Sequence, residues 1–166
     1  YEGDWKKTSQ FAFDNNVLQY RTENALKRTL SEIISRLKVL PEDAISLLVS
    51  GAPNEQLQIL WFAACIRYQF IYDFAVEVIR EKYNLMQNEL TQLDYDAFFN
   101  SKLNWHEELD KLTDNTRYKL RQILFKMLRE VEIIDTNNYI MTTFVSPRVQ
   151  EIVKNYDINY LNIFPN

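Results

Sequence analysis

Hydrophobic residues recur at intervals of three and four positions along most of the chain, which is the spacing of one face of an α-helix. The clearest stripe lies in residues 113–134, and its members are Leu120, Ile123, Leu124, Met127, Leu128 and Val131. A second stripe follows Thr22, a residue type that caps helix N-termini, and runs to about Val39. The pattern predicts amphipathic helices that pack their apolar faces around a common core.

Residues that cap or break helices mark where further helices begin and end. In chain order they are Asp4, Pro41, Gly51 and Asn54. From Glu55 to about Gln87 no break is obvious and apolar residues occupy several faces, which predicts a central helix. The helix is long for a globular protein, which leaves room for a kink near residues 67–69.

The polar stretch 84–92 is the best candidate for a domain boundary. After it, the pattern predicts short helices at about 95–103 and 105–112. The basic helix follows, capped by Thr113 or Asp114.

The segment after the basic helix favours β-structure. Residues 135–138 have turn chemistry between two β-favouring runs, which predicts a small hairpin over Ile133–Val145. Ser146-Pro147 then predicts the start of a last helix. Short helices, a longer helix and a hairpin follow one another in the order of a winged-helix module, with the basic helix as the recognition helix.

We therefore expect a mainly α protein in two closely packed parts. A helical bundle would occupy residues 1–88. A winged-helix-like half that contains the small β-hairpin would occupy residues 89–166.

The composition of the 166 residues excludes several kinds of site. Two glycines are too few for a P-loop or a dinucleotide-binding loop, which needs several in a short run. One histidine and one cysteine cannot supply a zinc site, and the carboxylates at 94–96 and 107–110 lack the glycine of a calcium loop. We expect no metal, no cofactor and no small-molecule substrate, and we interpret the protein as a non-enzyme.

Charge is distributed unevenly along the chain, whose formal net charge is -4. Residues 89–114 carry seven acidic side chains and two basic ones. From Asn115 to Arg129 there is no acid, and the basic residues are Arg117, Lys119, Arg121, Lys126 and Arg129. Such a run either contacts a polyanion or forms a solvated or partner-binding side of the helix.

Contact with nucleic acid would use these five side chains on the phosphate backbone, with Lys27 and Arg28 as a second patch. If all five met phosphates, log affinity would fall against log salt with a slope of roughly -4 to -5. We expect Arg121 and Arg129 to be exposed, so that reversing both charges removes most binding without unfolding. For Arg28, an ion-pair ladder with Glu32 and Arg36 is an alternative role.

Two features bear on the compartment. The longest apolar run, Ile59–Ile66, is too short to cross a membrane and is followed by Arg67. Cys65 is the only cysteine, which excludes an intrachain disulfide and fits a reducing compartment. We therefore expect a cytoplasmic protein without membrane contact.

Several short segments in a characteristic order resemble the BrxA family of bacterial BREX phage-defence systems. They are Asn16-Val-Leu-Gln19, Lys27-Arg28, Arg36-Leu37, Phe74-Ala-Val-Glu-Val78 and Thr116-Arg-Tyr-Lys-Leu-Arg-Gln122. The resemblance implies a helical, non-catalytic accessory protein that binds double-stranded DNA with little sequence preference. It also implies action beside other BREX defence proteins, and an N-terminal piece that precedes Asp4 in other members.

Two alternatives stay open. The first is an interaction scaffold that docks other defence components, and an exposed apolar patch beside the basic helix would favour it. The second is an RNA-binding helical protein, and a preference for structured or single-stranded RNA over duplex DNA would favour it.

Overall fold

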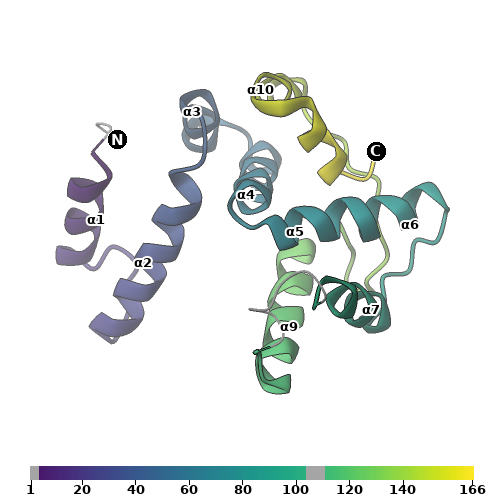
Figure 1. The fold of residues 1–166 in the computed structure, drawn as a ribbon. Helices are drawn as coiled ribbons and strands as arrows, with labels where there is room; N and C mark the ends of the chain where they lie inside the picture. The colour runs from purple at the N-terminus through teal and green to yellow at the C-terminus, as the bar shows by residue number, and fades with distance from the viewer. Residues whose placement is uncertain (1–3, 104–110) are drawn as a thin grey trace.

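The computed structural model describes residues 4–103 and 111–166, and these residues are mainly helical (Figure 1). The α-helices are α1 (Trp5–Asp14), α2 (Glu23–Leu37), α3 (Glu42–Ser50), α4 (Pro53–Arg67), α5 (Gln69–Phe74), α6 (Glu81–Asn84), α7 (Gln92–Leu103), α9 (Asp114–Glu130) and α10 (Pro147–Asp157). A π-helix, η1 (Ala75–Arg80), joins α5 to α6, and a 3₁₀-helix, η2 (Ile158–Ile163), follows α10. Most of the helix predicted at 105–112 lies outside the described residues.

Side-chain caps begin four of these helices at the predicted residues. Asp4 accepts hydrogen bonds from the backbone N–H groups of Lys6 and Lys7. Thr22, Thr113 and Ser146 each accept from the N–H three residues later, at the starts of α2, α9 and α10. Each cap satisfies a donor that the helix itself leaves unpaired, which explains why these boundaries could be predicted.

The predicted cap at Asn54 is wrong. Helix α4 begins at Pro53 with Ala52 as its N-cap residue. Proline suits the first helical position because its missing N–H would have been unpaired there anyway. The carboxylate of Glu55 then accepts the Ala52 N–H at 2.9 Å, which pairs the backbone donor of the N-cap residue.

The long central helix is broken at Tyr68, inside the range expected for a kink. Tyr68 is extended, with φ -126° and ψ 102°, and the helical axis bends by 114° there. Among the described residues, no single helix is long and apolar enough to cross a membrane. Within the described ranges, one pair reaches that length and composition when its two members are taken together, the pair bent at Tyr68.

The core is centred on α4, as its apolar residues on several faces predicted. Trp61 and Phe62 are buried, and the Trp61 indole N–H donates to the Ile163 carbonyl at 3.1 Å. One continuous hydrophobic cluster includes residues from both sides of residue 88, such as Leu47 and Val153. Helices α3, α4 and α10 therefore contribute to one shared core.

The predicted β-hairpin over Ile133–Val145 is not formed as a sheet, so the winged-helix order lacks its wing. In the described parts of the chain, pairing is limited to two isolated antiparallel bridges, Ile134 with Ile140 and Glu89 with Tyr139. The arms share two bonds, from the Asp135 N–H to the Tyr139 carbonyl and from the Met141 N–H to the Ile133 carbonyl, and residues 138–140 also bond to residues 88–90. The Thr143 N–H turns to the Pro165 carbonyl at 2.7 Å, so the two arms separate before a hairpin is built.

Helices α1 and α2 stand side by side at one edge of the molecule (Figure 1). Helix α2 packs on α4, whereas α1 packs on α2 and has no buried residue. Helix α9 lies below α5 in this view, on the side of α2 opposite to α1. These positions leave α2 between two surfaces, one toward α1 and one toward α9.

Candidate nucleic-acid interface

Two of the five basic residues on α9 are held against the protein. The Arg121 guanidinium donates to both carboxylate oxygens of Asp96 at 2.8 Å, and its side chain is 16% exposed. The Arg117 guanidinium carbon lies 5.0 Å from the centre of the Phe99 ring. The expectation that Arg121 is exposed is therefore wrong, because a carboxylate on α7 lies within its reach.

The other three basic residues of α9 are exposed. Arg129 donates to the Asn138 side chain at 2.8 Å, and Lys126 lies 3.6 Å from Glu130. Lys119 has no hydrogen-bond or ion-pair partner among the described residues. The outer face of α9 therefore presents three cations, fewer than the sequence predicted.

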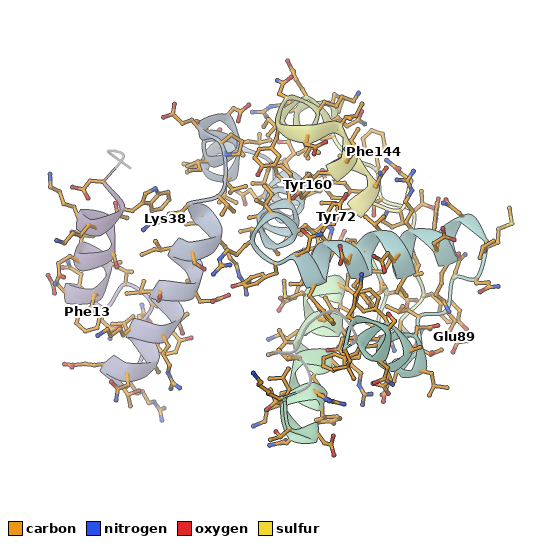
Figure 2. All side chains as sticks on the ribbon, in the orientation of Figure 1. Phe13, Lys38, Tyr72, Glu89, Phe144 and Tyr160 are labelled. Carbon is orange, nitrogen blue, oxygen red and sulfur yellow. The ribbon has the colours of Figure 1, made fainter. Side chains whose placement is uncertain are left out.

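Lys27 lines a groove between α1 and α2, here called the α1/α2 groove, with a volume of about 630 Å³. Its lining residues are Trp5, Lys6, Ser9, Gln10, Phe13, Lys27, Leu30, Ser31, Ile34, Ser35 and Lys38. Figure 2 labels two of them, Phe13 on α1 and Lys38 at the end of α2. Three lysines and three serines line the groove, and none of these lining residues is acidic.

The groove follows from the spacing of residues on α2. Lys27, Ser31 and Lys38 lie four and seven positions apart, so they share the helix face that also carries Leu30 and Ile34. The two lysines are about 16 Å apart along the helix axis, at 1.5 Å per residue. That distance is about the axial rise of five nucleotides of one DNA strand, at 3.4 Å each.

Arg28 faces a different hollow. It lines a shallow surface depression with Thr29, Glu32, Ile33 and Arg36, and its Nε donates to the Asn24 carbonyl at 3.3 Å. The ion pair with Glu32 is formed by Arg36, which donates to that carboxylate at 2.9 Å. The Tyr68 hydroxyl also donates to Glu32 and, with Arg36, holds the pKa of that carboxyl below its ordinary value although burial opposes the shift.

The structure does not bring the two predicted patches together, because no cation of α9 lines the α1/α2 groove. Lys6 and the three serines were missed by sequence reasoning. A signal was present: on α2, lysine and serine alternate with Leu30 and Ile34 on one face, and Trp5 and Phe13 offer apolar partners on α1.

The described residues contain no group of three or more histidine, cysteine, aspartate or glutamate side chains arranged to hold a metal ion. The carboxylates at 107–110 lie outside the described residues. Cys65 is fully buried, which raises the pKa of its thiol well above the ordinary value. Its thiolate is therefore scarce at neutral pH, so it is poorly suited to act as a nucleophile.

Comparison with known proteins identifies the family. The described residues form a small, mainly helical protein with a lysine-lined surface groove, and the BrxA family model matches residues 2–157. The chain therefore belongs to the BrxA family of bacterial BREX phage-defence systems, as its sequence resemblance indicated.

Two curated relatives show how far the likeness extends. The BREX protein BrxA of Bacillus cereus (strain H3081.97) is 29% identical over 72% of this chain and 60% of the relative. The BREX protein BrxA of Escherichia coli O9:H4 (strain HS) is 26% identical over 84% of this chain and 67% of the relative. The matched part of the chain thus spans about three fifths to two thirds of these relatives.

A solved structure shares the fold. The crystal structure of an uncharacterized protein from Magnetospirillum magneticum superimposes with a TM-score of 0.85 and 21% sequence identity. The match covers 99% of this chain and 87% of that chain. The helical arrangement, including α1 and α2, is therefore shared with an experimentally determined structure.

Proposed function

We propose that this protein is a non-catalytic, cytoplasmic accessory component of BREX phage defence that binds double-stranded DNA with little sequence preference. Membership of the BrxA family supports the setting and suggests other BREX proteins as partners. The α1/α2 groove supports the DNA contact. Three lysines line it and none of its lining residues is acidic, on a chain whose net charge is -4.

The chemistry of the groove suits a phosphate backbone. Lysine ammonium groups act as point charges on phosphates, and serine hydroxyls donate to phosphate oxygens. Base reading uses bidentate side chains such as arginine, asparagine or glutamine; of these only Gln10 lines the groove, and its amide already donates to Asp14 at 2.7 Å. Binding through Lys6, Lys27 and Lys38 would therefore be nearly blind to sequence.

Helix α9 contributes less than its sequence indicated. Lys119, Lys126 and Arg129 remain available as an outlying set of phosphate contacts. Arg117 and Arg121 act instead as supports, one stacked on Phe99 and the other paired with Asp96. The main DNA contact thus moves from α9 to the pair α1 and α2.

A fluorescence-anisotropy titration of labelled duplex DNA tests the proposal. The Lys27→Glu/Lys38→Glu variant should bind at least tenfold more weakly than the wild type at low salt, because it places two carboxylates against the backbone. Lys111→Glu/Lys154→Glu is the matched control, with the same charge change at exposed positions outside the groove.

Equal loss in both variants would show that only net charge matters and would contradict the groove assignment. Duplexes of unrelated sequence should bind alike, and an unlabelled RNA hairpin should compete no better than duplex DNA. A clear preference for the RNA would replace DNA binding with the RNA-binding alternative.

A further inference from the structure

The second surface of α2 faces an apolar groove with a volume of about 400 Å³, here called the α2/α9 groove. Its lining residues are Glu32, Arg36, Tyr68, Phe70, Ile71, Tyr95, Phe99, Leu120, Ile123, Leu124 and Met127. Four helices contribute to it, namely α2, α5, α7 and α9, with Tyr68 at the bend before α5. None of these lining residues also lines the α1/α2 groove.

The apolar stripe of α9 is wider than the core can cover. Leu124 and Leu128 are buried, whereas Leu120 is 39% exposed and Ile123 is 53% exposed on the groove side. Both exposed side chains lie beside the buried part of the stripe, so they form a continuous apolar surface with it. Apolar surface of this kind beside a polar rim is typical of a protein-binding site.

A buried polar atom in the lining also lacks a partner. Tyr95 is 1% exposed, and its hydroxyl has no hydrogen-bond partner among the described residues. Buried hydroxyls are nearly always paired in folded proteins, so an orphan beside a groove is unusual.

Four basic side chains stand around the groove, and one of them, Lys126, lies 3.6 Å from Glu130. On one side, Arg36 and Arg67 lie over the Tyr68 ring, at 5.5 Å and 5.0 Å from its centre. On the other side, Lys119 and Lys126 lie four positions before and three positions after Ile123, which makes them its neighbours on the helix surface. Glu32, which lines the groove, is already bonded to Arg36 and Tyr68.

We propose that the α2/α9 groove docks an acidic amphipathic helix of a partner protein. The stripe from Leu120 to Met127 extends about 10 Å, which is two helical turns and matches anchors at positions i, i+3 or i+4, and i+7 of a bound helix. Acidic residues flanking those anchors would meet Arg36 and Arg67 on one side and Lys119 and Lys126 on the other. A nucleic-acid backbone fits this groove poorly, because its lining offers phosphates little except Arg36.

Binding of synthetic peptides to the intact chain tests the proposal. The probe is a fluorescein-labelled helical peptide of about five turns with leucine at i, i+3 and i+7 and glutamate on its flanks. One control peptide carries lysine in place of glutamate, and another has the acidic sequence scrambled. The acidic amphipathic peptide should bind saturably, at least tenfold more tightly than either control.

Matched variants locate the binding. Ile123→Asp should weaken the acidic peptide at least tenfold, and Arg36→Glu/Lys119→Glu should weaken it and favour the lysine peptide. Ile123→Ala, which removes apolar surface without adding charge, should give an intermediate loss. Lys27→Glu/Lys38→Glu should leave peptide binding unchanged while it weakens DNA binding, so the two sites succeed or fail separately.

Three outcomes would overturn the proposal. In the first, the acidic peptide binds no better than the scrambled peptide. In the second, the folded Ile123→Asp variant binds the acidic peptide as tightly as the wild type does. In the third, the wild type is a dimer in sedimentation analysis and Ile123→Asp a monomer, which would assign the groove to a second copy of this chain.

Discussion

The Arg121 guanidinium lies 2.8 Å from each carboxylate oxygen of Asp96, and this pair joins α9 to α7. Arg121 is the central member of the basic run on α9, and it faces a carboxylate from the acidic segment that precedes that helix. Part of the charge asymmetry along the sequence is therefore neutralised within the fold. A run of basic residues becomes a basic surface only where such partners are absent.

We predict that Arg121 stabilises the protein rather than contacting DNA. Arg121→Ala and Asp96→Ala should each lower the free energy of unfolding by about 1 kcal/mol, because the pair is charge-assisted but Asp96 is half exposed. Urea denaturation of both single variants and the double variant forms a double-mutant cycle. The double variant should lose less than the sum of the two single losses, with a coupling of about 0.5–1 kcal/mol.

The DNA affinity of an Arg121 variant tests the same assignment in a second way. Arg121→Ala should retain DNA affinity within about twofold when it is folded. If its affinity fell tenfold at unchanged stability, Arg121 would have to release Asp96 and contact phosphate, and the support role would be wrong.

The salt dependence of DNA binding is the second prediction. Three lysine contacts in the α1/α2 groove account for about -2.7 of the slope of log affinity against log salt, and each outlying phosphate contact from α9 adds about -0.9. Lys27→Gln/Lys38→Gln should reduce the magnitude of that slope by about 1.8. Anisotropy titrations from low to moderate salt measure both values, and Lys119→Gln/Lys126→Gln is the comparison for α9. A larger slope change in the α9 variant would return the main contact to α9.

Local chemistry made the helix starts predictable. Asp4, Thr22, Thr113 and Ser146 form hydrogen bonds within three residues, so each cap depends only on neighbours in the sequence. The start of α4 was misjudged because Asn54 suits a cap in isolation. Pro53 and Glu55 together favour Ala52 as the N-cap residue. Both lie within three positions of Ala52, so this signal was local as well.

Long-range contacts could not be predicted from one sequence. Arg121 and Asp96 are 25 positions apart, and nothing in either segment indicates that α7 and α9 place them together. The hairpin pairing ends early for a related reason: the Thr143 N–H bonds to the Pro165 carbonyl, a contact set by the whole fold. For the candidate site, Lys27 was predicted, whereas Lys6 became part of it only when α1 packed on α2.

A buried carboxylate at the start of α4 gives the third prediction, a pH-dependent stability. Hydrogen bonds from the Ala52 N–H and the Ser146 hydroxyl, with the charge of Arg148, hold the pKa of Glu55 below its ordinary value although burial opposes them. A lowered native pKa stabilises the folded state above the pKa of the unfolded chain, and this stabilisation is lost as pH falls through the native pKa. Glu55→Gln should therefore be less stable than the wild type at pH 7.

The test for Glu55 is the pH profile of that difference. The stability gap between wild type and Glu55→Gln should stay constant from pH 7 to about pH 5 and then shrink as the pH falls further. Urea midpoints at several pH values measure it, and Glu151→Gln at an exposed position of α10 is the control. A gap that is the same at pH 3 and pH 7 would mean that the carboxylate charge plays no part.

The fourth prediction concerns the bond from Trp61 on α4 to the carbonyl of Ile163 near the C-terminus. Trp61 is 1% exposed, and Trp61→Phe removes both the indole donor and part of a packed ring. The loss should be about 2–4 kcal/mol, from an unpaired buried carbonyl and a small cavity. Leu60→Ala, on the same helix at a position 44% exposed, should cost less than about 1 kcal/mol.

Digestion from the C-terminus separates local from global effects of Trp61. Because the indole bonds directly to the Ile163 carbonyl, Trp61→Phe should release η2 before α4 unfolds. Carboxypeptidase should then remove the final residues from Trp61→Phe faster than from Leu60→Ala under native conditions. Equal digestion rates, with a large stability loss in Trp61→Phe alone, would show that Trp61 acts through core packing and that the bond to Ile163 contributes little to holding the C-terminal segment.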